Sequence, residues 1–84
     1  MNRTIFYLAE EILGLGEWAF EEPEIENGHL HLCACVKAYG DGWTDYYDSR
    51  DGSGHGIDKA PAFVDAVRRR FPEIKSVSIT IHHD

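Results

Sequence analysis

Basic side chains are scarce in this sequence. Its 84 residues hold 8 Lys and Arg against 15 Asp and Glu, which gives a formal net charge of −7. Affinity for nucleic acid is built largely from Lys and Arg that neutralise phosphates. We therefore expect no direct binding of nucleic acid, and the charge instead permits a basic protein as partner. The three arginines at 68–70 fall in the last turn of a predicted helix, where cations complement the helix dipole.

The sequence also lacks long apolar runs and an excess of cysteine. No stretch approaches the ~20 apolar residues of a membrane-spanning helix, and the first apolar segment is soon cut by Glu10 and Glu11, unlike a signal peptide. The two cysteines, Cys33 and Cys35, would lie ~6.5 Å apart on one strand face, too far for an unstrained disulfide. We therefore expect free thiols in a reducing compartment, a cytoplasmic location and no contact with a membrane.

The stretch from 29 to 39 alternates without a break between apolar and other side chains. Successive side chains of a strand point to opposite faces. The stretch therefore predicts a strand with one face in the core and one face that carries chemistry. The predicted core face comprises Leu30, Leu32, Ala34, Val36 and Ala38, and the opposite face comprises His29, His31, Cys33, Cys35, Lys37 and Tyr39.

A hairpin is predicted just before this strand. Asn27-Gly28 suits a type I′ turn, which needs positive φ at both central residues, so residues 17–26 would form the partner strand. A strict register puts Trp18 and Phe20 on the polar face. A bulge near Glu22-Pro23 would shift the parity, and we favour it because proline cannot donate to the ladder and large aromatics usually pack inside.

Apolar spacing also predicts two helices. Residues 4–13 carry an apolar stripe at helical spacing, with Thr4 or Asn2 as N-cap and Gly14 directly after the last turn. Residues 61–71 carry a second stripe, begin with a proline and are followed by another, both of which suit a helix boundary.

Two further strands are expected, over 43–48 and 75–82, with a flexible loop over 51–59. The order αβββαβ predicts an α+β fold whose four-stranded, mostly antiparallel sheet has two helices on one face. The first three strands would form a meander that pairs Lys37 with Asp45. The last strand would run parallel to the first and third strands and would lie beside the first. A chain of this length forms a single domain, 1–84.

The face with histidine and cysteine is one candidate site. Imidazole and thiolate are ligands that zinc prefers, but four side chains in a row on one strand cannot surround an ion. A metal would need further ligands from a neighbouring strand or loop, and a plain polar outer face explains the pattern as well. We expect no bound metal or cofactor and keep a metal or thiol site as an alternative, on His29, His31, Cys33 and Cys35.

The second candidate is an acidic and aromatic segment. Tyr and Trp are typical contact anchors, and arrayed carboxylates attract a basic partner. Glutamates at 21, 22, 24 and 26 flank the first hairpin as well. This composition predicts a protein-binding surface that imitates the charge of nucleic acid, whereas the alternative is a solvated rim that keeps the domain soluble. The predicted binding residues are Asp41, Trp43, Asp45, Tyr46, Tyr47 and Asp48.

No serine or cysteine has a general base at a set spacing, so we expect no enzyme. In its short length, acidic balance and lack of a catalytic motif, the chain is similar to small phage-encoded inhibitors such as anti-CRISPR proteins; this resemblance lies in composition and covers no motif. It implies a non-enzymatic inhibitor that docks on a basic surface of a nucleic-acid-handling complex. A further alternative is a self-associating domain, a homodimer that pairs through a sheet edge or an open sheet face.

Overall fold

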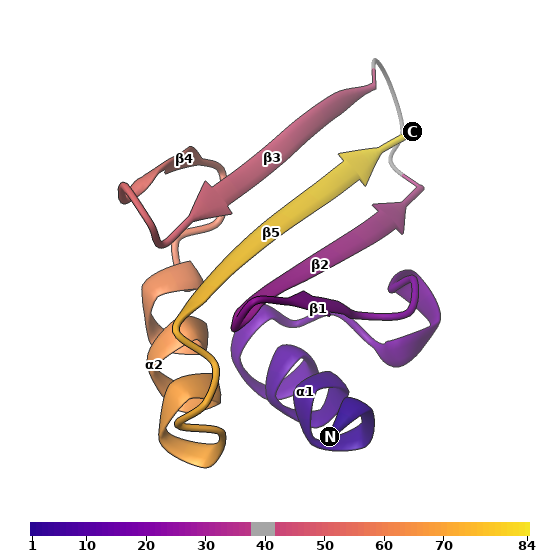
Figure 1. The fold of residues 1–84 in the computed structure, drawn as a ribbon. Coiled ribbons are helices and arrows are strands. Elements are labelled where there is room, and N and C mark those ends of the chain that lie inside the picture. The colour runs from indigo at the N-terminus through magenta and orange to yellow at the C-terminus, as the bar shows by residue number, and fades with distance from the viewer. Residues whose placement is uncertain (38–41) are drawn as a thin grey trace.

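The computed structural model describes residues 1–37 and 42–84, which fold into one mixed sheet backed by helices (Figure 1). The first helix has an α-helical part that continues as a π-helical turn, and a short 3₁₀ helix follows it. The elements in chain order are α1 (Asn2–Leu8), η1 (Ala9–Leu13), η2 (Glu17–Ala19), β1 (Glu24–Glu26), β2 (His29–Val36), β3 (Trp43–Asp48), β4 (Ser53–His55), α2 (Ala60–Arg70) and β5 (Ser76–His83).

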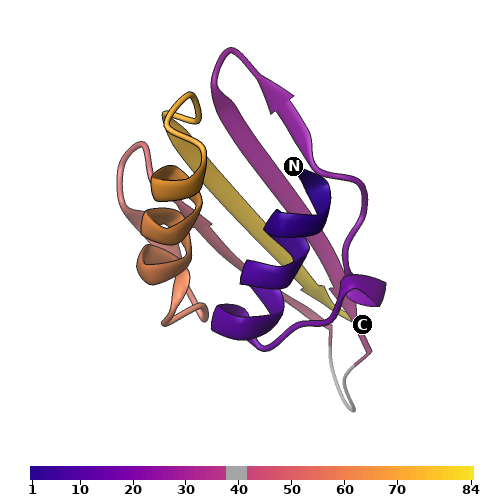
Figure 2. The same cartoon turned by 90° about the horizontal axis from the view of Figure 1, so that it is seen from below.

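The sheet has the strand order β1-β2-β5-β3-β4 in the described part of the chain. Its centre is a parallel pair, β2 with β5, in which Leu32 lies opposite Ile79. The other pairings are antiparallel, and β3 hydrogen bonds to the far side of β5. Both helices lie on the same face of the sheet (Figure 2). The predicted α+β class and the placement of the two helices on one face are therefore confirmed.

The predicted number and order of strands are wrong. A fifth strand, β4, occupies part of the predicted loop, and β5 enters between β2 and β3 instead of lying beside the first strand. The expected pair of Lys37 with Asp45 is not formed, since Asp45 lies opposite Ile81. The sequence pattern does not predict β4, because its Ser-Gly-His segment has little strand propensity. This extra strand reverses the chain before α2, so that β5 runs parallel to β2.

The predicted hairpin between β1 and β2 is confirmed. Asn27 and Gly28 have φ values of 53° and 78°, and Ile25 lies opposite Leu30. Positive φ at both turn residues is what a type I′ turn requires, and asparagine and glycine tolerate it best.

The predicted bulge is also present. Glu24 lies opposite His31, and an isolated bridge joins Phe20 to Ala34. The outer segment therefore spends four steps where β2 spends three, so one residue is extra. The shift places Phe20 on the core side, where its ring centroid lies 5.9 Å from that of Phe6.

Trp18 does not follow Phe20 into the core, and this part of the prediction is wrong. Residues 17–19 form η2 instead of a strand, and the Trp18 side chain is 78% exposed. Its indole still has a defined place, because it lies so close to Gly16 that a Cβ there would come 2.6 Å from the indole Nε1. The chain thus holds a large aromatic side chain in solvent.

The predicted end of the first helix is confirmed, but its predicted start is wrong. Gly14 follows η1 with φ of 76°, the left-handed conformation that suits glycine. The N-cap is Met1, without a side-chain hydrogen bond, so neither Thr4 nor Asn2 caps the helix. The second helix begins at Ala60, one residue before its prediction, and has proline in its first turn.

The core lies between the helices and the sheet. The helices contribute apolar side chains from one stripe each, and β2 and β5 contribute every second residue, as predicted. The largest fully buried side chains are Phe63, Ile5, Leu30, Leu32, Ile74, Ile79, Val67 and Val77.

We expect Ile79→Ala to lower the free energy of unfolding by about 2–5 kcal/mol, because it leaves a cavity in the middle of the central strand. Thr80→Ala is the matched control, since the next residue of β5 points away from the helices and should change stability by less than about 1 kcal/mol. Urea unfolding followed by circular dichroism measures both. Equal losses in the two variants would contradict this division of the strand.

Candidate functional site

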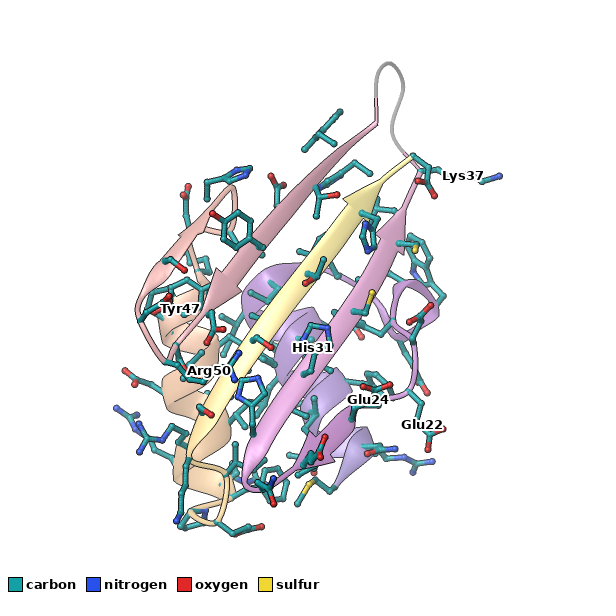
Figure 3. The ribbon with its side chains drawn as sticks, turned by 45° about the horizontal axis from the view of Figure 1, so that its top comes forward. Glu22, Glu24, His31, Lys37, Tyr47 and Arg50 are labelled. Atoms are coloured by element: carbon teal, nitrogen blue, oxygen red, sulfur yellow. The ribbon has the colours of Figure 1, made fainter. Side chains whose placement is uncertain are left out.

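The sheet face without helices carries the predicted row of histidine and cysteine side chains. Figure 3 looks onto this face, with the helices behind the sheet. His29, His31 and Cys33 are partly buried there, and Cys35 is exposed. The odd-numbered residues of β2 therefore line an open face, as the alternation predicts.

The two histidines bind neighbouring serines. Because β2 and β5 pair in parallel, His29 lies opposite Ser76 and His31 lies opposite Ser78. The Nδ1 of His29 is 2.6 Å from Ser76 Oγ, and its Nε2 is 2.8 Å from Ser78 Oγ. Ser78 Oγ also lies 2.6 Å from His31 Nδ1. Burial, and then the charge of Arg50, lower the pKa of His29, which favours its neutral ring.

The two cysteines follow the histidines along the same face of β2. Cys33 lies opposite Thr80, and Cys35 lies opposite His82; both thiols are free. Burial, and then the charge of Glu21, raise the pKa of Cys33, which favours the neutral thiol over the thiolate. Within residues 1–37 and 42–84, no three His, Cys, Asp or Glu side chains converge on a metal position.

Strand β3 divides the predicted binding residues between the two faces of the sheet. Tyr46 and Asp48 lie opposite Thr80 and Ser78 of the open face. The three remaining described residues, Trp43, Asp45 and Tyr47, lie on the helix side. Asp41 falls outside the described residues. The segment therefore does not present its aromatic and acidic side chains as one surface.

The carboxylates of this segment already have partners. Arg50 Nη2 donates to Asp48 Oδ2 at 2.7 Å, and Arg50 Nε donates to Asp48 Oδ1 at 3.0 Å. These hydrogen bonds lower the pKa of Asp48 to about 2. His83 Nε2 donates to Asp45 Oδ2 at 2.9 Å. Of the aromatic residues, Tyr47 packs against the core, whereas Trp43 and Tyr46 are 47% and 43% exposed.

Most of the net charge lies elsewhere. Residues 4–36 contain seven glutamates and no Lys or Arg, whereas residues 37–84 contain eight acids and seven bases. With Arg3, these charges sum to the −7 of the chain. All seven glutamates are exposed. The absence of any Lys or Arg over 33 consecutive residues is a signal in the sequence that marks this segment.

We name the main concentration of these charges the acidic edge. It comprises Trp18 and the exposed glutamates of η2, of the bulge and of β1, segments that follow one another along the outer side of β2 (Figure 1). Figure 3 shows Glu22 and Glu24 on this side of the sheet. None of the ion pairs found among the described residues involves its glutamates. The acidic edge consists of Glu17, Trp18, Glu21, Glu22, Glu24 and Glu26.

Comparison with protein-family models, curated proteins and solved structures gives no significant match to this chain. In the two described ranges, no helix has the length and apolar character needed to cross a membrane. The function must therefore be argued from the surfaces themselves.

The pair of Asp48 with Arg50 predicts a pH dependence. A folded-state pKa of about 2, below the ordinary 3.8, means that the pair stabilises the fold above pH ~4 and that this contribution is lost as the pH falls toward 2. Arg50→Met should raise the Asp48 pKa toward its ordinary value, as measured by carboxyl NMR titration. Arg68→Met, on the exposed side of α2, is the control and should leave that pKa unchanged. An Asp48 pKa near 4 in the unmodified protein would contradict the pairing.

Proposed function

We propose that this protein is a non-enzymatic binding protein whose acidic edge docks on a basic surface of a protein partner. The observation that carries the proposal is the segregation of charge: all seven glutamates of 4–36 are exposed, the segment contains no Lys or Arg, and five of the seven glutamates lie on the acidic edge. Arrayed carboxylates of this kind select partners with clustered Lys and Arg.

In the proposed interface, Trp18 provides an apolar contact in addition to the charged contacts of the glutamates. Tryptophan is among the residues most often responsible for binding energy at protein interfaces, where it fills a pocket inside a polar rim. Here the 78% exposed indole lies close to Gly16, and Glu17, Glu21 and Glu22 are its neighbours along the chain. A tryptophan has few rotatable bonds, so it loses little conformational freedom on binding.

A nucleic-acid-handling complex offers the surface that fits best. Such complexes carry Lys and Arg where phosphates bind. A protein that covers those side chains with carboxylates would keep nucleic acid away, which agrees with the compositional resemblance to phage-encoded inhibitors. The proposed activity is therefore inhibition by occupancy, with no chemical step.

Charge reversal tests the acidic edge. The variant Glu17→Lys/Glu21→Lys/Glu22→Lys/Glu24→Lys should lose the partner that the unmodified protein captures from its host. The variant Glu10→Lys/Glu11→Lys/Asp65→Lys/Glu73→Lys has the same net charge, changes exposed residues elsewhere and should retain it. Mass spectrometry identifies the captured protein, and binding is then measured with that protein purified. Equal capture by the two variants, or a captured partner without a basic surface, would refute the proposal.

We further expect Trp18→Ala to weaken the purified complex by about 30-fold, the ~2 kcal/mol typical of an interface anchor. The stability of the variant should be unchanged, because the Trp18 side chain is mostly exposed to solvent and lies close to Gly16. Trp43→Ala is the matched control, as an exposed tryptophan on β3. Isothermal titration calorimetry gives both affinities, and a larger effect of Trp43 would move the interface to the segment predicted from sequence.

The same charge-reversal experiment can be applied to β3, the segment that the sequence predicted as the binding surface. Reversal of Asp45 and Asp48 should weaken binding less than reversal along the acidic edge, because His83 and Arg50 already bind these carboxylates.

The metal alternative is tested by metal analysis of untagged protein and by melting in chelator. Self-association is tested by light scattering; pairing through two acidic edges would bring like charges together and is disfavoured.

A further inference from the structure

A small pocket lies on the helix side of the sheet, where η1 ends and the chain enters α2. Figure 2 shows the backbone of this region, with the end of η1 and the start of α2 on the same side of the sheet. Its volume is about 210 Å³. The pocket has apolar walls contributed by two different layers: Leu13 and Leu15 follow the first helix, Ile57 precedes the second, and Ile81 rises from β5. No residue of the acidic edge lines it, so the pocket is separate from the docking surface proposed above.

The Asp45 carboxylate is the main polar group in this pocket. Its side chain is 14% exposed, and Oδ2 accepts a hydrogen bond from His83 Nε2 at 2.9 Å. The His83 ring is itself held by stacking on Trp43, with 4.5 Å between ring centroids. The other oxygen, Oδ1, lies 3.6 Å from His55 Nδ1, which is too far for a hydrogen bond. Oδ1 therefore accepts no hydrogen bond from the described residues and keeps acceptor capacity next to the pocket.

The backbone is shaped around this carboxylate. Gly56 has φ of 84°, and a Cβ at this position would collide with the Asp45 carboxyl group. Only glycine therefore lets the loop pass so close to Asp45. The carboxylate is thus fixed from three sides, by Gly56, by His83 and by the strand that carries it.

The charges that line the pocket favour a cation. The described residues that line it include two carboxylates, of Asp45 and Asp58, one ammonium, of Lys59, and the imidazole of His83, while the His55 ring lies beside Asp45. With neutral imidazoles the lining carries one net negative charge. The net charge of −7 also raises the local concentration of cations. The volume is below the ~300–1,000 Å³ typical of pockets for drug-sized ligands. A ligand for this site is therefore small, has a compact apolar body and carries one strong hydrogen-bond donor.

We propose that the pocket binds a small organic cation, a protonated amine on a compact apolar group. Its ammonium donates to Asp45 Oδ1, and its apolar body packs against Ile57 and Ile81. A charge-assisted hydrogen bond in a partly desolvated site is stronger than one in water. This site does not depend on the docking proposal, because it uses different residues and a different ligand.

Benzylamine is the probe, with benzyl alcohol and benzoate as matched neutral and anionic compounds. We expect benzylamine to shift the methyl NMR signals of Ile57 and Ile81 in the full-length protein, with saturation at millimolar concentration. Benzyl alcohol should bind at least ~10-fold more weakly, the effect of one lost charge-assisted hydrogen bond, and benzoate should not bind. Binding of benzoate in place of benzylamine, or the absence of shifts at Ile57 and Ile81, overturns the proposal.

Variants separate a direct role of Asp45 from a structural one. Asp45→Asn should weaken benzylamine binding ~10-fold or more, whereas Asp48→Asn, on the opposite face of β3, should leave it unchanged. Lys59→Gln should strengthen binding several-fold, because it removes a competing positive charge. This gain does not depend on whether Asp45→Asn folds, and an unchanged or weaker affinity in Lys59→Gln contradicts a cation in the pocket.

Discussion

The parallel pairing of β2 with β5 is the constraint on which the structure depends. It joins eight residues of one strand to eight of the other, from His29 with Ser76 to Val36 with His83. On one side the register aligns Leu30 with Val77 and Leu32 with Ile79, which gives both helices an apolar surface to cover. On the other side it aligns imidazoles with serine hydroxyls, which satisfies polar groups that the helices leave uncovered. Strand β3 is then added on β5, and the hairpin strand β1 on β2.

The sequence predicts those parts of the fold that depend on neighbouring residues. Strict alternation identified β2 and β5, Asn27-Gly28 identified the hairpin, and Pro23 identified the bulge that turns Phe20 inward. The strand order could not be predicted, because it depends on which distant segments pair. Strand β4 has no local pattern at all, and missing it reversed the expected direction of β5.

Of the candidate surfaces, the sequence predicts one correctly and misplaces the others. The open face with His29 and Cys35 was predictable, since one period of two residues decides it. The acidic and aromatic residues of β3 were treated as one patch although consecutive strand residues point apart, so Asp45 and Asp48 lie on opposite faces. Trp18 was missed because a 3₁₀ turn interrupts the strand pattern that would have buried it.

The separation of charge along the chain has a mechanical consequence. The five glutamates of the acidic edge lie on the β1 side of the sheet, whereas Arg68, Arg69 and Arg70 end the helix that packs beneath the other half (Figure 1). The whole molecule is thus a permanent electric dipole. In the field of a positively charged body such a molecule experiences a torque as well as a pull, so it would turn its β1 side forward during approach. Screening limits this torque to the last ~8 Å or so at physiological ionic strength.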